Sequence, residues 1–357
     1  METQALLFIP DMSGFTKFIT ETEIQHSNHI ISELIEVILK SNELNLSISE
    51  IEGDAVLFYR VGEPPKTGEI IRQSKKMFID FHVYLKVIER DNVCRCGACK
   101  TASSLTLKFI THYGEIREVA IQRFHKLIGR DVILAHSLLK SSIPTKEYLL
   151  LSEQYLETQH SVLSINESWI TIEPNVDIVE NFGEISTKYI PLTPLRKFVP
   201  APPKLEEIKI EGKPIDLSIH IDAPILLVHE VLTDAKSKIH WVAGIREVRD
   251  TEAIPRINSS HTCIFEDLEI HVVTKKNSVS GDEIKYIERG ETSMGLNMIS
   301  DYKLKEVNSS THLSLRIVPQ LTENIPQDVV MHMVESVRKS LGLLKEYCEK
   351  LSVERDK

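Results

Sequence analysis

The stretch "EIEGDAVLFYR", residues 50–60, places a glycine–aspartate pair between two segments that are typical of β-strands. Ile48 and Glu50 precede the pair in an alternating pattern, so we expect them on one face of a strand. A continuous apolar run follows the pair. Because Gly53 and Asp54 suit a short turn, the stretch predicts a β-hairpin.

Three carboxylates, those of Glu50, Glu52 and Asp54, gather near the tip of this hairpin. Turn chemistry alone accounts for an aspartate beside a glycine. The other interpretation is a functional site, since hard cations bind to carboxylate oxygens. The hairpin by itself leaves both interpretations open.

Length, charge and cysteine content limit the class of protein. The chain has 357 residues, enough for two domains, and a formal net charge of −10, which argues against a general nucleic-acid-binding surface. Its first apolar run is too short for a signal peptide or a membrane span. Five cysteines, an odd number, do not suit a secreted disulfide framework. We therefore expect a cytoplasmic protein with no membrane span and no nucleic-acid partner.

Five prolines within residues 191–207 predict an extended linker between domains at residues 1–190 and 208–357. The first domain alternates strands and helices in the approximate order β-α-β-β-α-β-α-β, which predicts an α+β sheet with helices on one face. The second has several short alternating strands and ends in an amphipathic helix at about residues 326–350. This pattern predicts an antiparallel sheet around a long C-terminal helix.

A second segment, "FIPDMSGFTKF" at residues 8–18, combines a strand ending in Asp11 with a glycine-containing turn and a helix start. Together with the "EGD" hairpin it resembles the catalytic core of class III nucleotide cyclases. Three later segments resemble later parts of that family in the same order. They are a strand ending in a Gly-Glu turn (residues 107–116), a glycine before a helix (residues 126–139) and a further strand (residues 147–154). The resemblance covers residues 5 to about 157 and implies a ferredoxin-like cyclase-homology sheet. The whole chain is also similar to an uncharacterised bacterial family of this architecture.

This resemblance implies a metal and nucleotide site. Cyclases hold two divalent cations between two carboxylates, which bind the triphosphate and activate the attacking hydroxyl. Asp11 and Asp54 would hold Mg²⁺ or Mn²⁺, with the Met12 carbonyl as a further ligand. The phosphates of a purine nucleotide would meet the turn and the hairpin tip, at Ser13, Gly14, Phe15, Thr16 and Gly53. Because cyclases of this type are head-to-tail dimers, the resemblance also implies a homodimer.

Glu50 and Lys126 stand at the two positions that contact the purine in this family. Glutamate at the first position goes with guanine, because a carboxylate can accept from two neighbouring N–H donors. Lys126 is neither the usual acidic residue nor the usual cysteine. The alternative is a Glu50–Lys126 ion pair that fills the base pocket.

Ile133 and Ser137 depart from the family, since members that cyclise carry an asparagine and an arginine there. Loss of this charge stabilisation can cost roughly 10³-fold in rate. We therefore expect a cyclase-like sensor or regulatory signalling protein that binds metal and nucleotide without efficient cyclisation. The alternatives are an active, GTP-leaning cyclase (a phosphorus–oxygen lyase) and a non-catalytic interaction protein with vestigial sites.

The loop "CRCGACK" brings together three thiols, those of Cys94, Cys96 and Cys99. With a fourth donor, such as His82, His112 or a residue of a partner chain, they would suit Zn²⁺. A redox-sensitive loop and an ordinary loop are the alternatives.

Residues 215–248 resemble the opening of the START and polyketide-cyclase-like helix-grip (SRPBCC) superfamily, with a strand, an "APxxxV" helix start and a tryptophan-containing segment. The resemblance covers residues 208–351. It implies a cavity that holds a hydrophobic small molecule. The side chains expected to line this cavity are Trp241, Met294, Met298 and Met333. A filled core is the alternative.

Overall fold

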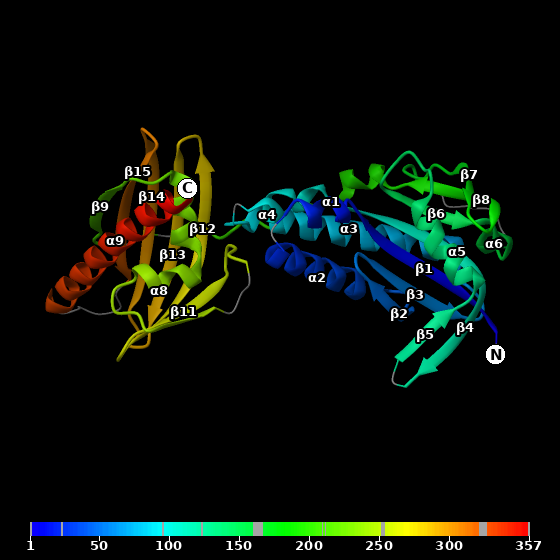
Figure 1. The fold of residues 1–357 in the computed structure, drawn as a ribbon, viewed down its shortest axis with the longest axis horizontal. Helices are drawn as coiled ribbons and strands as arrows, with labels where there is room; N and C mark the ends of the chain where they lie inside the picture. Colours follow the sequence, from blue (N-terminus) through cyan, green and yellow to red (C-terminus); the bar gives the residue numbers. More distant parts are fainter. Residues whose placement is uncertain are drawn as a thin grey trace. The chain divides into compact units, whose positions relative to one another are not determined.

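The computed structural model describes residues 2–22, 24–94, 96–122, 124–159, 167–208, 210, 212–250, 254–320 and 327–355. The chain forms two compact units, Met1–Glu89 with Lys100–Pro203, and Arg90–Cys99 with Lys204–Lys357 (Figure 1). The division after Pro203 falls inside the predicted linker. Arg90–Cys99 belongs to the second unit, although its position in the sequence places it among residues of the first.

The first unit is built on a mixed eight-stranded sheet in the order β2-β3-β1-β4-β6-β8-β7, with β5 paired to β4. β4 and β6 run parallel and the other neighbours antiparallel. The strands are β1 Thr3–Ser13, β2 Ser47–Glu52, β3 Ala55–Val61, β4 Thr106–Ile121, β5 Phe124–Ile128, β6 Tyr148–Ser152, β7 Glu173–Val179 and β8 Gly183–Pro191. The helices are α1 Phe15–Thr20, α2 Ile24–Lys40, α3 Thr67–Asp91, α4 Gly97–Thr101, η1 Ala102–Ser104, α5 Arg130–Ser137, η2 Leu138–Lys140, α6 Glu153–Glu157 and η3 Thr193–Phe198.

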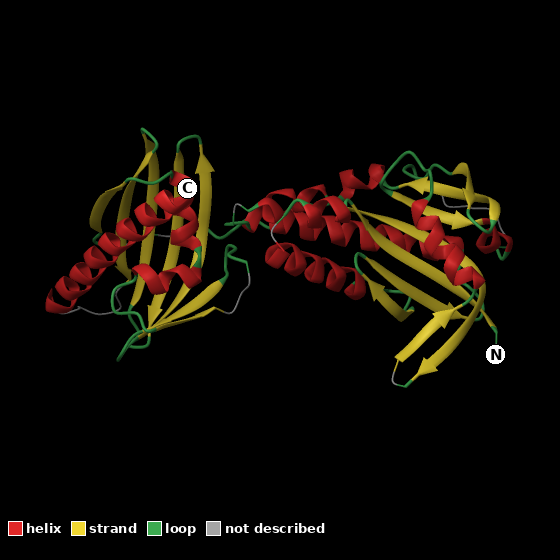
Figure 2. Cartoon of the chain, in the orientation of Figure 1, coloured by secondary structure: helices red, strands yellow, loops and turns green. Residues whose placement is uncertain are grey.

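Side chains cover both faces of this sheet, whereas the sequence predicted helices on one face. Ala5 and Leu7 of β1 share a core with Leu134 of α5. On the opposite face of β1, Leu6 and Phe8 are also fully buried. Figure 2 shows helices on either side of the sheet. A strand covered on both faces has a continuous apolar run, which does not reveal how the helices are distributed.

Two further expectations about this unit are wrong. β4 runs without a break through Gly114 and Glu115, so there is no Gly-Glu turn at that point. The proline-rich segment is not extended throughout, because η3 forms within it and buries Leu195. Pro194 fits the start of this helix, where its missing N–H is not needed.

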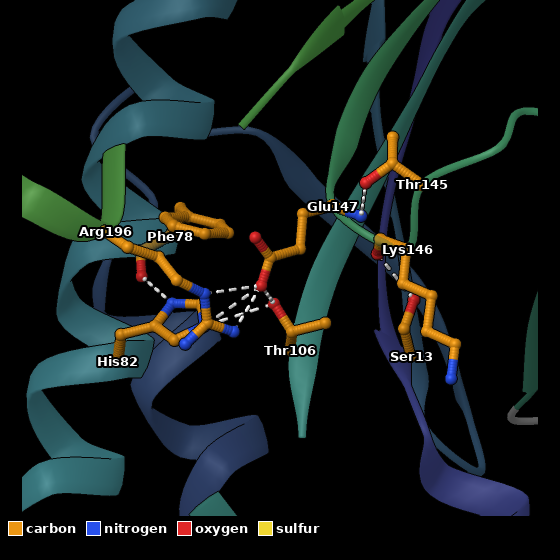
Figure 3. A network of polar contacts seen from close by, with 8 residues as sticks. All are labelled: Ser13, Phe78, His82, Thr106, Thr145, Lys146, Glu147 and Arg196. Carbon is orange, nitrogen blue, oxygen red and sulfur yellow. Dashed lines mark hydrogen bonds and ion pairs between the residues drawn. The ribbon is translucent and has the colours of Figure 1, made fainter. Parts of the chain in front are cut away.

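A buried carboxylate anchors η3 (Figure 3). Glu147 Oε1 accepts hydrogen bonds from Arg196 Nε at 2.7 Å and from Thr106 Oγ1 at 2.7 Å. Burial raises the pKa of Glu147, but hydrogen bonds from Arg196, Thr106 and Thr193, together with the charge of Arg196, leave that pKa below its ordinary value. The carbonyl of the adjacent Lys146 accepts from Ser13 Oγ at 2.9 Å. The network therefore holds the end of β1, where Asp11 lies.

The second unit is a seven-stranded antiparallel sheet in the order β10-β11-β12-β13-β14-β15-β9, packed against the long helix α9. The predicted antiparallel sheet and final helix are thus present. The strands are β9 Ile215–Ile221, β10 Glu247–Asp250, β11 Ser260–Ile264, β12 Glu269–Ser280, β13 Glu283–Thr292, β14 Asn297–Val307 and β15 Ser310–Gln320. The helices are α7 Ile225–Thr233, η4 Ala235–Ser237, α8 Lys238–Trp241 and α9 Gln327–Arg355. Across the described parts of both units, no helix is long and apolar enough to cross a membrane.

An ion pair lies in the interior of the second unit. Lys238 Nζ contacts the two Glu288 carboxylate oxygens at 2.8 and 3.0 Å, and the two side chains are 4% and 6% exposed. The Tyr286 hydroxyl donates to Glu288 at 2.9 Å and lies 3.0 Å from Thr274 Oγ1. Burial raises the pKa of Glu288, but Lys238 and His261 lower it below its ordinary value. The Glu288 carboxylate is therefore ionised at neutral pH.

Candidate functional site

The predicted hairpin is present, with Gly53 at a φ of 61° in the turn between β2 and β3. The expectation that Ile48 and Glu50 share a face is wrong. A bulge between them pairs Ile48 with Phe58 and Glu50 with Leu57. Because directly opposite residues share a face, the extra residue turns Glu50 away from Ile48 and toward the face of Leu57.

Backbone pairing places Asp11 and Asp54 side by side. Asp11 lies opposite Ala55 in the β1–β3 ladder, and the Met12 amide donates to the Asp54 carbonyl at 3.1 Å. Met12 is itself 1% exposed, so only its backbone is suited to a ligand role. The two carboxylates that the sequence singled out therefore come from β1 and from the turn directly before the adjacent strand β3.

Burial and a neighbouring charge both affect the Asp54 carboxyl. Burial, and then the neighbouring Asp11 carboxylate, raise the pKa of Asp54 to about 6. On the other side, Lys108 Nζ lies 3.1 Å from Asp11 Oδ2. Lys108 was missed by the sequence reasoning, although a lysine inside the apolar strand "LTLKFI" was an available signal. Two carboxylates and one ammonium thus share a partly buried space.

The turn after β1 contacts the hairpin tip. Gly14 has a φ of 95° and leads the chain into α1. The Phe15 ring lies 3.8 Å from the position that a β-carbon on Gly53 would take, so the two motifs meet. The Ser13 hydroxyl already donates to Lys146, and α1 has only 6 residues, so few aligned amides remain for a phosphate. Thr16 borders the same space.

An open cleft of about 1440 Å³ gathers almost all of the predicted metal and nucleotide residues. Those that border it are Asp11, Met12, Ser13, Gly14, Phe15, Thr16, Glu50, Asp54 and Lys126. Gly53 is not among its lining residues and instead supports Phe15. Five further cations border the cleft, namely Lys17, Lys108, Arg130, Lys140 and Lys146. The cleft therefore combines paired carboxylates with cations, a combination that suits a metal-bound phosphate.

Glu50 already has two side-chain partners. Lys126 Nζ lies 3.1 Å from Glu50 Oε2, and His136 Nε2 lies 3.7 Å from Glu50 Oε1. The hydrogen bond with Glu50 raises the pKa of Lys126. The ion pair that the sequence left as an alternative is thus formed. One oxygen of Glu50 and one of Glu52 also lie within 4.8 Å of a His136 ring nitrogen, which makes a small second group of metal-ligating types.

Helix α5 presents the departures from the cyclase pattern to the cleft. Ile133 is 61% exposed and borders the cleft. The Ser137 hydroxyl donates to the Ile133 carbonyl at 2.8 Å, within its own helix. The Arg130 guanidinium lies 5.2 Å from the centre of the Phe182 ring. Ile133 and Ser137 therefore offer the cleft neither a charge nor the amide of an asparagine.

In the second unit, the four side chains expected around an apolar cavity lie in three kinds of environment. Trp241 is 4% exposed and belongs to the main core. Met298 and Met333 are partly buried and pack against this core. Met294 is 68% exposed, between β13 and β14, so it does not line the interior.

Comparison with known proteins gives three kinds of match. A family model described as "Protein of unknown function (DUF2652)" matches residues 31–148. "Uncharacterized protein Rv2561/Rv2562" of Mycobacterium tuberculosis is 29% identical over 164 residues, which are 45% of this chain and 73% of that protein.

Solved structures similar to parts of the chain include two from other organisms. The guanylyl cyclase domain of the RhoGC fusion protein from Blastocladiella emersonii has a TM-score of 0.37 and 16% identity, covering 53% of this chain and 97% of that one. Protein CV1439 from Chromobacterium violaceum has a TM-score of 0.31 and 17% identity, covering 38% and 97%. None of these similarities says what this chain binds, which depends on the side chains of the cleft.

Proposed function

We propose that the first unit binds a divalent cation, Mg²⁺ or Mn²⁺, and a purine nucleotide in this cleft, as a cyclase-like sensor or regulatory protein without efficient cyclisation. The observation that carries the proposal is the Asp11–Asp54 pair. Two adjacent carboxylates repel one another, and the Asp11 charge adds to burial in raising the pKa of Asp54. A divalent cation relieves that repulsion, and phosphate oxygens complete its coordination.

The rest of the cleft suits a nucleotide. Lys140 and Lys146 border the cleft, and their charges complement those of phosphates. We propose that Glu50 accepts hydrogen bonds from the purine edge after Lys126 and His136 move away from it, and an acceptor at this position favours guanine. Following the same resemblance to cyclases, we propose a homodimer, which sedimentation equilibrium tests.

The experiment that tests this function uses the full chain with Mn²⁺ and, separately, GTP and ATP. Nucleotide affinity and cyclic product are measured in the same samples. Binding with little product supports a sensor. Rapid product formation supports the runner-up, an active cyclase. Neither binding nor product supports an interaction protein with vestigial sites.

The pKa of Asp54 predicts how the affinity for Mn²⁺ depends on pH. The cation must displace the proton that Asp54 holds below a pH of about 6. We expect the Mn²⁺ affinity to fall about tenfold per pH unit below that value and to level off above about pH 7. Without metal, the stability of the fold changes with pH in the opposite direction. The raised pKa means that the folded state holds the Asp54 proton more tightly than the unfolded state. The free energy of unfolding therefore falls as the pH rises from the ordinary pKa of an aspartate through about 6. Calorimetric titrations of wild type and Asp54→Asn between pH 5 and pH 8 check this, and the same slope in both would contradict it.

For the second unit we propose binding of a hydrophobic small molecule that carries one polar group. The support is a pair of buried polar atoms, Trp241 Nε1 and His261 Nε2, for which the described part of the chain provides no hydrogen-bond partner. Buried polar atoms of this kind usually have a partner. In a Trp169→Phe background, the fluorescence of Trp241 should change saturably on titration with 1-anilinonaphthalene-8-sulfonate. An unchanged spectrum would favour the filled core.

A further inference from the structure

The three-thiol loop formed by Cys94, Cys96 and Cys99, called the cysteine loop below, belongs to the second unit. Val93 just before it is 1% exposed and lies in the core of that unit. The Val93 amide also donates to the Pro255 carbonyl at 3.3 Å. The loop therefore begins at a fixed point of the fold.

The three sulfur atoms converge. Their Sγ atoms all lie within 4.8 Å of one another. The Cys96 amide donates to Cys94 Sγ at 3.5 Å, and the Cys99 amide donates to Cys96 Sγ at 3.4 Å. Cys99 is 5% exposed, and the other two are half-buried. N–H groups directed at sulfur stabilise thiolates, so the backbone is arranged for negative charge at this place.

From this convergence we infer that the cysteine loop binds one Zn²⁺ ion through its three thiolates. Tetrahedral zinc with Zn–S bonds of about 2.3 Å needs sulfur atoms about 3.8 Å apart, which a small closure of the loop provides. Binding displaces the thiol protons, and the ion takes a fourth ligand from outside the loop. The site does not depend on the proposed nucleotide function.

The two histidines that the sequence suggested as a fourth ligand have other partners. His82 Nδ1 lies 2.7 Å from the Phe78 carbonyl, and Nε2 lies 3.1 Å from Thr106 Oγ1. The ring nitrogens of His112 contact Ser152 at 2.9 Å and Asp131 at 3.0 Å. Both rings are buried and use both nitrogens.

Disulfide formation is the competing chemistry. None of the five cysteines, all of which lie in the described part of the chain, forms a disulfide in this structure. Three closely spaced thiols that do not bind metal would be readily oxidised. Metal content and thiol oxidation state are therefore measured together.

The test uses the full chain purified without chelators. We expect about one zinc ion per chain, and on replacement by Co²⁺ a thiolate-to-cobalt charge-transfer band with the strong visible bands of tetrahedral cobalt. Single Cys94→Ser, Cys96→Ser and Cys99→Ser substitutions should each lower the affinity for Co²⁺ about 100-fold or more. Cys263→Ser, which changes a buried cysteine of β11 outside the loop, serves as the matched control and should leave the metal content unchanged.

Two results would overturn the inference. One is wild-type protein with reduced thiols that shows no bound zinc and no charge-transfer band with Co²⁺. The other is a mass lower by two hydrogens, with two thiols lost, which would identify a redox loop. Because both measurements use wild-type protein, they decide the question even if a serine variant fails to fold.

Discussion

Replacement of Asp54 by asparagine lowers the Mn²⁺-dependent affinity for GTP and ATP by about 100-fold or more. Asparagine keeps the size of the side chain and the backbone contact to Met12, but it removes one of the two charges that hold the cation. The same loss is expected for Asp11→Asn, because the two side chains share one ion. Calorimetric titration of each variant with nucleotide, with and without Mn²⁺, measures the effect.

The matched control for this prediction is Glu52→Gln. Glu52 lies on the same hairpin and borders the same cleft, but it groups with Glu50 and His136, not with the Asp11–Asp54 pair. We expect less than about threefold change for this variant. Equal losses in Glu52→Gln and Asp54→Asn would show that general acidity of the tip, and not the specific pair, binds the cation.

Replacement of Lys238 by alanine lowers the free energy of unfolding of the second unit by about 3–5 kcal/mol. Among the residues that the structure describes, the substitution leaves Glu288 with no opposite charge at hydrogen-bonding distance, and the Tyr286 hydroxyl satisfies only part of its hydrogen-bonding capacity. Urea denaturation in a Trp169→Phe background, followed by the fluorescence of Trp241, measures this change.

Two control variants test whether the loss of stability comes from leaving a buried charge without a partner or from the loss of any ion pair. The double variant Lys238→Met with Glu288→Leu should recover most of the stability, because apolar side chains avoid the desolvation penalty of both charges. Arg316→Ala removes an ion pair with Asp216 whose side chains are 55% and 60% exposed, and it should leave the free energy of unfolding nearly unchanged. Equal losses for Lys238→Ala and Arg316→Ala would contradict the account.

Features coded by neighbouring residues were predictable from the sequence. Gly53 and Asp54 form the expected turn, and Asp11 lies near the end of the expected strand. The final helix was also found, because its apolar positions repeat with the helical period. Leu341, Leu344 and Cys348 of that helix do lie in the core. In each case the sequence pattern that predicts the feature lies within one continuous segment of the chain.

Features that depend on pairing between distant segments were not predictable. The pairing of Lys108 with Asp11 follows from the register of β1 and β4, which no local pattern states. The bulge that turns Glu50 toward Lys126 adds one residue whose effect appears only in the ladder. Strand β7 was missed because its apolar residues do not mark a buried face, since Val176 is 53% and Ile178 is 89% exposed while Asp177 between them is buried.

The most direct test of the central claim is a crystal structure of the full chain grown with Mn²⁺ and a non-hydrolysable GTP analogue. We expect an anomalous manganese peak between the carboxylates of Asp11 and Asp54, with the phosphates of the analogue in contact with the ion. We also expect that Lys108 moves from its position 3.1 Å from Asp11 to make room for the ion. An ordered analogue elsewhere, or no manganese peak at these two carboxylates, would contradict the account.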